Sequence, residues 1–245
     1  MIKVVTIDFW NTLYDSSNGV ERNSLRRHSL LEEMAKFNKK LTNQEFEDAL
    51  KASWEYFNKI WINEHRTPST EDTITFLWSY LNLPYEQFSI NKVARVFKES
   101  LLTYPPKLID DAVVFLKKYH NKYKFGLISD TGFTPGYLLT ELMNRDKVSK
   151  YFSAYSYSDE TGVSKPNPKA FLTILDKFNC KPNEALHIGD IERTDIEGAN
   201  SLGMYSIRFD GDSTSNFLKQ NKEKTKANHL VKSWNDVISI FEKYY

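Results

Sequence analysis

Short apolar runs that end at an aspartate recur along this chain and constrain its fold more than any other feature. Residues 3–8, 125–129, 185–189 and 205–209 are such runs, and each ends in or just before an aspartate. Helical patterns separate them at 109–119, 134–145, 167–179 and 194–202, and a short strand at 229–231 precedes a closing helix at 234–244. Strands that alternate with helices in this way predict an α/β fold with a doubly wound parallel sheet.

Several helix starts carry capping signals. Thr134 and Asn167 each precede a proline, which suits the first turn of a helix. Thr194 and Glu197 have the spacing of a capping box, in which each side chain bonds the backbone of the other residue. These signals predict where the helices of the sheet region begin.

Residues 16–103 interrupt the alternation, because they carry helical patterns and no convincing strand. Thr42 and Glu45 form a capping box ahead of an amphipathic stretch, whose Trp54 and Trp61 we expect in a helical core. We therefore predict two parts. Residues 1–15 and 104–245 form the catalytic core, and residues 16–103 form a smaller all-helical cap domain hinged over the active site.

Composition excludes several classes of function. The chain has 245 residues and 33 Lys+Arg against 32 Asp+Glu, so its net charge of +1 creates no global field for nucleic acid or an anionic membrane. One cysteine excludes an internal disulfide, and no apolar run is long enough to span a membrane. We expect a cytoplasmic monomer or homodimer. The charged run 221–226 is expected to be a solvated surface stretch.

The strand ends carry the candidate chemistry. Because ligands bind beyond the carboxyl ends of parallel strands, Asp8, Asp130 and Asp190 should converge. Asp8 can attack phosphorus as a carboxylate and form an aspartyl-phosphate. Asp190 and Asp195 lie five residues apart across a turn into a helix, where both carboxylates can face one small hard cation, and Mg²⁺ suits such an oxygen site.

Other polar residues suit a phosphorylated small-molecule substrate. Ser129, Asp130 and Thr131 offer hydroxyl and backbone N–H groups for phosphoryl oxygens. Lys165, just ahead of a helix start, is a point charge that can neutralise the nucleophile and the transferring group.

Four ordered motifs carry a resemblance to a known family. DFWNTL at 8–13, LISDTG at 127–132, SKPNP at 164–168 and GDIERTDIEGA at 189–199 closely resemble the motifs of the haloacid dehalogenase-like superfamily. The resemblance implies a Rossmann-like core, a helical cap after the first strand and a covalent aspartyl intermediate. It casts Asp8 as nucleophile and metal ligand, Ser129 as phosphoryl binder, Lys165 as charge stabiliser, Asp190 as metal ligand and Asp195 as support for the metal. Thr12, in the first motif, is expected to bind substrate.

Trp10 departs from the family pattern. Phosphatases of this family have a second Asp at this place as the acid for the leaving group, and indole cannot transfer a proton at neutral pH. The position still offers its backbone carbonyl to Mg²⁺. The 2-haloacid dehalogenases have an aromatic Tyr here, but they use no metal and replace the first acidic residue of the fourth motif, which this chain keeps as Asp190. Phosphonatases have a small residue at this place and use a cap lysine, and Trp10 is too bulky for that pattern.

These observations favour a Mg²⁺-dependent phosphatase for a small metabolite. The alternatives are a C-halogen hydrolase of the 2-haloacid dehalogenase type and a catalytically silent member that binds a ligand or partner. His65 and Arg66, in a polar loop between cap helices, are the preferred substrate contacts. If the cap supplies an acid, His28 and His65 are the candidates, whereas His187 is expected to be a packed core histidine.

Overall fold

The computed structural model describes residues 1–39, 41–215 and 224–245. In this part of the chain six strands form one parallel sheet in the order β3-β2-β1-β4-β5-β6. The strands are β1 (Val4–Asp8), β2 (Lys124–Ser129), β3 (Phe152–Tyr157), β4 (Ala185–Gly189), β5 (Tyr205–Phe209) and β6 (His229–Val231). The chain reverses its direction of growth across the sheet between β1 and β4, which is where an open α/β sheet binds its ligand.

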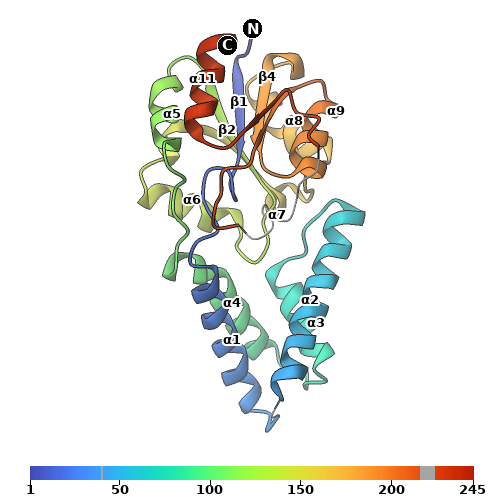
Figure 1. Cartoon of the computed structure of the whole chain (residues 1–245). Coiled ribbons are helices and arrows are strands. Elements are labelled where there is room, and N and C mark those ends of the chain that lie inside the picture. The colour runs from blue at the N-terminus through green and yellow to red at the C-terminus, as the bar shows by residue number, and fades with distance from the viewer. Residues whose placement is uncertain (40, 216–223) are drawn as a thin grey trace.

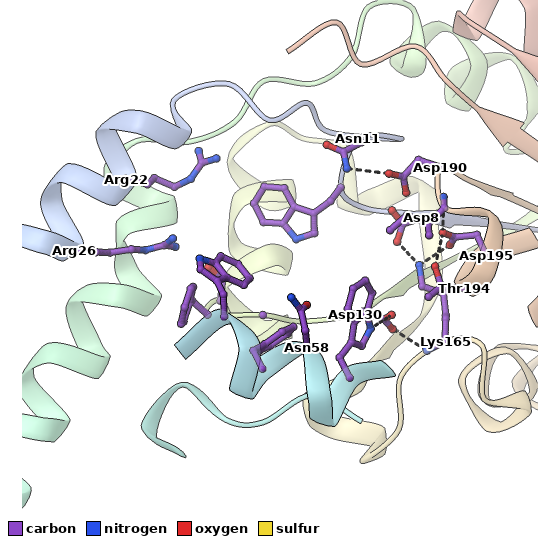
Figure 2. Close-up of a pocket in the computed structure, with 18 residues that line it drawn as sticks. Asp8, Asn11, Arg22, Arg26, Asn58, Asp130, Lys165, Asp190, Thr194 and Asp195 are labelled. Atoms are coloured by element: carbon purple, nitrogen blue, oxygen red, sulfur yellow. Dashed lines mark hydrogen bonds and ion pairs between the residues drawn. The ribbon is translucent and has the colours of Figure 1, made fainter. Parts of the chain in front are cut away.

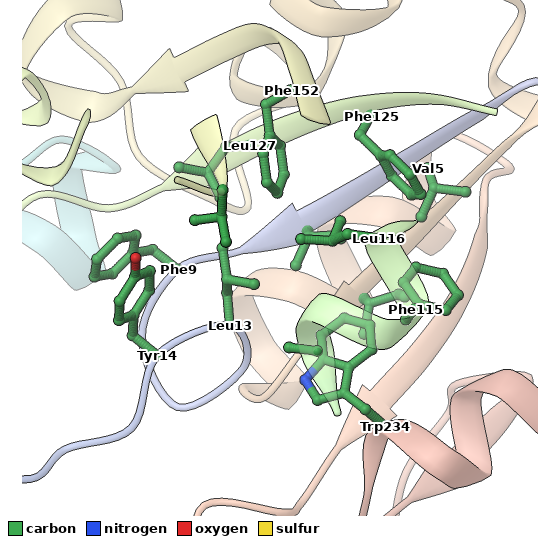
Figure 3. Close-up of a cluster of buried hydrophobic side chains, with 14 of the residues drawn as sticks. Val5, Phe9, Leu13, Tyr14, Phe115, Leu116, Phe125, Leu127, Phe152 and Trp234 are labelled. Carbon is green, nitrogen blue, oxygen red and sulfur yellow. The ribbon is translucent and has the colours of Figure 1, made fainter. Parts of the chain in front are cut away.

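Helices cover both faces of the sheet, which confirms the doubly wound α/β architecture (Figure 1). One face packs on α5 (Ala112–Tyr119), α6 (Gly136–Arg145) and α11 (Trp234–Tyr244). Figure 3 shows this core, in which Phe115, Phe125 and Trp234 meet under the strands. The other face packs on α8 (Pro168–Lys177) and α9 (Glu197–Ser201) through Phe171, Ile174 and their neighbours.

Three strands have the predicted bounds, at 185–189, 205–209 and 229–231, and β1 and β2 each differ from prediction by one residue. β3 was not predicted, because its sequence FSAYSY lacks the β-branched composition of a buried strand. It follows a short 3₁₀ turn, η1 (Ser149–Tyr151), and precedes the one-turn helix α7 (Ser158–Thr161).

Two predicted caps are wrong and two are confirmed. Pro135, not Thr134, lies at the N-cap of α6 and makes no side-chain cap. The motif at 189–199 forms a π-helix, η3 (Glu192–Ile196), ahead of α9, and the Thr194 hydroxyl bonds the Asp195 carboxylate instead of closing a capping box. Asn167 caps α8, and the Thr42 capping box is present. The 3₁₀ turn η2 (Pro182–Glu184) leads into β4.

Within the described residues of 19–39 and 41–103, four helices form a block, named here the helical block: α1 (Gly19–Ala35), α2 (Asn43–Glu64), α3 (Thr70–Tyr80) and α4 (Gln87–Thr103). It has its own buried apolar cluster, which includes Leu30, Trp78 and Val93. In Figure 1 the block lies beyond one end of the sheet, on the side away from both termini.

Two chain segments join the helical block to the sheet. The N–H of Asp15 donates to the carbonyl of Lys107 at 2.8 Å, and the N–H of Lys107 donates to the Asp15 carboxylate at 2.8 Å. These bonds hold the outgoing and returning segments side by side. Among the described residues, no helix is long and apolar enough to cross a membrane. The predicted solvated run 221–226 lies partly outside them, at 221–223.

Candidate active site

The carboxyl ends of three adjacent strands bring the predicted aspartates together. Asp8 is the last residue of β1, and Asp130 and Asp190 directly follow β2 and β4, the two neighbours of β1. Asp8 and Asp190 are buried, and all three line one cavity. The convergence expected from the strand ends is therefore present, and Figure 2 shows these carboxylates around Lys165.

Lys165 is the charged centre of this cluster. Its buried Nζ donates to Oδ1 of Asp8 and, at 2.6 Å, to Oδ1 of Asp195. The four-carbon side chain of Lys165 arrives from the loop ahead of α8, where the SKPNP motif places it. The ammonium group thus touches the predicted nucleophile directly, as its predicted role requires.

Protein groups donate hydrogen bonds to both oxygens of the Asp195 carboxylate. Its Oδ1 accepts from Lys165 and from His187 Nε2 at 2.9 Å, and its Oδ2 accepts from the Ile191 N–H and the Thr194 hydroxyl, each at 3.1 Å. The contacts fit a residue that orients Lys165. A direct metal bond from Asp195 would require one of them to break, so its metal role stays a prediction.

His187 extends this chain of contacts into the sheet. It is buried in β4, as expected of a core histidine, and its Nδ1 lies 2.8 Å from Thr6 Oγ1. Because a carboxylate only accepts, Nε2 carries the hydrogen toward Asp195 and Nδ1 accepts from Thr6. Gly189 permits the approach, since a Cβ there would lie 2.4 Å from the Asp195 side chain.

Burial acts to raise the pKa values of the active-site carboxyl groups, whereas the positive charge of Lys165 acts to lower them. Burial raises the pKa of Asp8 to about 7, although Lys165 acts to lower it. Burial and the nearby charge of Asp8 raise the pKa of Asp190. The pKa of Asp195 is lowered, since Lys165 and His187 outweigh burial. Several buried carboxylates thus share one lysine, and the excess negative charge favours a cation at Asp8 and Asp190.

Hydroxyl groups near Asp8 lack partners. The Oγ of Ser129 and the Oγ1 of Thr12 are buried without a hydrogen-bond partner among the residues that the structure describes. The Thr131 hydroxyl is instead bonded to Ser158 at 2.9 Å. Ser129 is the last residue of β2, beside the end of β1, and Thr12 lies in the turn after β1. Neither residue lines the cavity that holds Asp8, so their predicted binding of phosphoryl oxygens stays a prediction.

A cavity of about 360 Å³ opens above the cluster, between the sheet and the helical block. Its lining combines charged side chains with aromatic rings, which come from Trp10, from α2 and from the loop after β2. The lining side chains from the helical block are Arg22, Arg26, Trp54, Phe57, Asn58 and Trp61. A cavity of this size suits a small molecule.

The sequence interpretation missed most of this wall. Trp54, Phe57, Asn58 and Trp61 repeat at helical spacing, so they occupy one face of α2, and both tryptophans were wrongly assigned to a helical core. Trp61 Nε1 donates to Asp130 Oδ2 at 2.9 Å, and the Arg193 guanidinium lies 3.9 Å from the centre of its ring. The signal available in the sequence was a polar residue, Asn58, on an otherwise apolar face of the helix.

The predicted cap contacts lie elsewhere. His65 and Arg66, at the end of α2, do not line the cavity, and Arg66 pairs with Glu64 at 2.7 Å. His28 is exposed on α1 beside Glu32. The structure gives no support to these residues as substrate contacts or acids, and their roles stay predictions. Asn11, which was not singled out, donates to Asp190 Oδ2 at 2.9 Å and holds that carboxylate in the cavity.

Asp8, Asp190 and the backbone of Trp10 could hold a cation. No group of three or more His, Cys, Asp or Glu side chains in ranges 1–39, 41–215 and 224–245 is arranged as a metal cage. Mg²⁺ needs none, since one or two carboxylates, waters and substrate oxygens usually complete its six oxygen ligands. The unbalanced negative charge at Asp8 and Asp190 therefore fits this ion.

Comparison with known proteins agrees with the motifs. A family model described as haloacid dehalogenase-like hydrolase matches residues 2–203. The glyceraldehyde 3-phosphate phosphatase of Pyrococcus abyssi is 28% identical over 209 residues, which cover 85% of this chain and 82% of that protein. A 2-haloacid dehalogenase from Pseudomonas syringae shares the fold with a TM-score of 0.73 and 19% identity over 100% of both chains. A HAD phosphatase from Thermococcus onnurineus does so with a TM-score of 0.69 and 18% identity over 98% of both. Since both chemistries occur on this fold, the fold alone does not choose between them.

Proposed function

Because this chain belongs to the haloacid dehalogenase-like hydrolases, we propose that it is a phosphatase for a small phosphorylated metabolite, with Asp8 as nucleophile. The observation that carries the proposal is the set of contacts of Lys165, which bonds Asp8 and Asp195 beside a buried Asp190. Displacement of halide from carbon has no need of the further carboxylate at 190. The sequence likeness to a glyceraldehyde 3-phosphate phosphatase supports the same choice.

In the first step, a carboxylate oxygen of Asp8 attacks phosphorus and the bond from phosphorus to the leaving oxygen breaks. Lys165 favours the anionic form of Asp8, against the effect of burial, and then faces the transferred phosphoryl group. The hydroxyls of Ser129 and Thr12, which are buried without a partner among the described residues, would bind phosphoryl oxygens. In the second step, water attacks phosphorus, the bond to Asp8 breaks, and phosphate leaves with Asp8 restored.

Asp8, Asp190 and the Trp10 carbonyl would hold Mg²⁺, which when bound supplies positive charge to the phosphoryl oxygens. Asn11 fixes the Asp190 carboxylate for this role, and His187 with Thr194 fixes Asp195, which in turn orients Lys165. The helical block acts as a cap that excludes water from the cavity, and the paired segments at Asp15 and Lys107 form its hinge.

The test is phosphate release from 4-nitrophenyl phosphate with Mg²⁺, with EDTA, and with EDTA followed by excess Mg²⁺. Turnover that EDTA abolishes and Mg²⁺ restores is the expected result. Halide release from 2-chloropropionate in EDTA, without phosphate release from the ester, would show that the protein is a dehalogenase and not a phosphatase. No turnover of either compound, nor of a panel of phosphorylated metabolites, would indicate a silent member.

A further inference from the structure

Two arginines of α1 reach the cavity at the side away from Asp8. Arg22 and Arg26 lie one helical turn apart, both line the cavity, and Figure 2 shows both pointing toward it from α1. Arg22 is only 6% exposed. Burial and then the charge of Arg22 lower the pKa of Arg26 to about 10. Two cations therefore share a poorly solvated position.

Neutral atoms satisfy only part of their hydrogen-bonding capacity. Arg22 Nη1 donates to the carbonyls of Ser17 and Tyr104, each at 2.8 Å. Arg26 Nε donates to the Ser100 hydroxyl at 2.9 Å, and its Nη1 reaches the Asn23 side chain at 3.3 Å. In the described part of the chain, no carboxylate oxygen lies within 4.0 Å of a guanidinium nitrogen of Arg22 or Arg26.

The next arginine on the same helix behaves differently. Arg27, which does not line this cavity, pairs with Glu47 at 2.7 Å. The negative charges of Asp15 and Glu21 act on Arg22 only from beyond ion-pair distance. Bracing of the hinge explains the carbonyl bonds of Arg22, but it does not explain two neighbouring arginines, one buried and one partly buried, with no carboxylate in ion-pair contact. Such an arrangement is costly unless an anion completes it, and the planar guanidinium suits the two oxygens of a carboxylate or phosphate.

Trp10, two residues after Asp8 in the chain, lines the same cavity and lies near Arg22. The Arg22 guanidinium is 5.7 Å from the centre of the Trp10 ring, and that of Arg26 is 5.1 Å from the Phe133 ring. Aromatic rings thus line the cavity that also holds the two arginines and Asp8. The cavity is built for a molecule with charge at both ends and an apolar or planar part between them.

On the basis of the proposed phosphatase function, we propose that Arg22 and Arg26 bind a second anionic group of the substrate. The substrates would then be phosphomonoesters that also carry a carboxylate or a second phosphate. A phosphomonoester with an uncharged far end would leave both guanidiniums unpaired and should be used poorly.

The test compares 4-carboxyphenyl phosphate with 4-carbamoylphenyl phosphate, which has the same shape but no second charge, and with 1,4-phenylene bisphosphate. We expect kcat/KM to be about 10- to 100-fold higher for the carboxylate than for the carboxamide, as a charge-assisted hydrogen bond predicts. Arg26→Gln and Arg22→Gln should bring this ratio close to one. Arg27→Gln, the matched control, should keep the ratio of the unmodified protein.

Each outcome decides the proposal. If only the bisphosphate is preferred, the arginine site binds a second phosphate. Equal use of all three esters overturns the proposal. If none of the three esters releases phosphate, the phosphatase proposal fails. Calorimetric binding of the carboxylate and carboxamide esters to the unmodified protein then still decides the arginine site, because equal affinities would refute it. That binding comparison also needs no variant, so a misfolded Arg22→Gln protein does not affect it.

Discussion

Asp8 is the residue on which the proposed chemistry depends most directly. Asp8→Asn keeps the shape of the side chain but removes the attacking charge, so phosphate release should fall by about 10³-fold or more. Its folding should survive, because the change removes a buried carboxylate whose pKa burial raises. Phosphate assays together with thermal unfolding check both points. Retained activity in a folded Asp8→Asn protein would exclude Asp8 as nucleophile.

Trp10 sets the expected dependence on the leaving group. The only acidic side chains of the cavity wall in the described ranges are Asp8, Asp130, Asp190 and Asp195. Asp130 is already bonded to the Trp61 indole and the Lys165 N–H. Aryl and acyl phosphates should therefore be cleaved about 10²- to 10⁴-fold faster than alkyl phosphates, which need a proton donor.

Replacement of Trp10 tests the same idea from the other side. Trp10→Asp should recover part of the rate for alkyl phosphates, with a stability loss below the ~3 to 5 kcal/mol of a fully buried tryptophan, because Trp10 is only partly buried. Rates for an aryl and an alkyl ester, measured with the unfolding free energy, check this. Similar rates for both esters in the unmodified protein would mean that another group donates the proton.

At the scale of elements, α1 and α4 are joined by a buried carboxylate. Glu33 of α1 bonds Lys36, Lys92 and Ser89 at 2.6 to 2.9 Å. Although burial acts to raise it, these bonds lower the pKa of Glu33 from 4.5 to about 2. Because the pKa is lower in the folded state, Glu33 stabilises the protein above pH 4.5, and this contribution is lost as pH falls toward 2.

Glu33→Gln should therefore lower the free energy of unfolding by about 1 to 3 kcal/mol at pH 7. The difference between the two proteins should shrink as pH falls from 4.5 toward 2. Urea unfolding at pH 7 and at pH 3 measures both values. As a control, Glu32→Gln on the exposed side of the same helix should have a much smaller effect. A gap between the proteins that does not depend on pH would contradict the assigned pKa.

At the scale of the whole molecule, Trp61 joins the helical block to the sheet. Its indole N–H bonds Asp130 while its ring packs on Arg193, so one side chain contacts two active-site loops. Trp61→Phe keeps the ring but loses the hydrogen bond. We expect KM to rise about 5- to 10-fold, because closure of the block over the substrate loses roughly one hydrogen bond.

The change should leave the melting temperature nearly unaltered, and steady-state kinetics with thermal unfolding measure the two effects separately. Trp54→Phe is the matched control, since Trp54 is 51% exposed and makes no hydrogen bond to the described residues. An equal rise in KM in both variants would show that loss of indole surface, rather than the bond to Asp130, causes the effect.

The sequence by itself determined five strands of the sheet, the four motifs and the convergence of Asp8, Asp130 and Asp190, while the role of Lys165 came from the resemblance of its motif. Buried parallel strands have a local apolar signature, and residues directly after such strands are placed by chain connectivity alone. Strand β3 was not predicted, because its sequence FSAYSY lacks that signature.

Tertiary structure alone decided what surrounds the reacting groups. The occupancy of Asp195 by Lys165 and His187 depends on how β4, η3 and the loop before α8 pack together. Which faces of α1 and α2 line the cavity depends on the angle at which the helical block meets the sheet, and no local pattern encodes that angle. For this reason His65 and Arg66 were chosen from the sequence, whereas the structure places Arg22, Arg26 and Trp61 at the cavity.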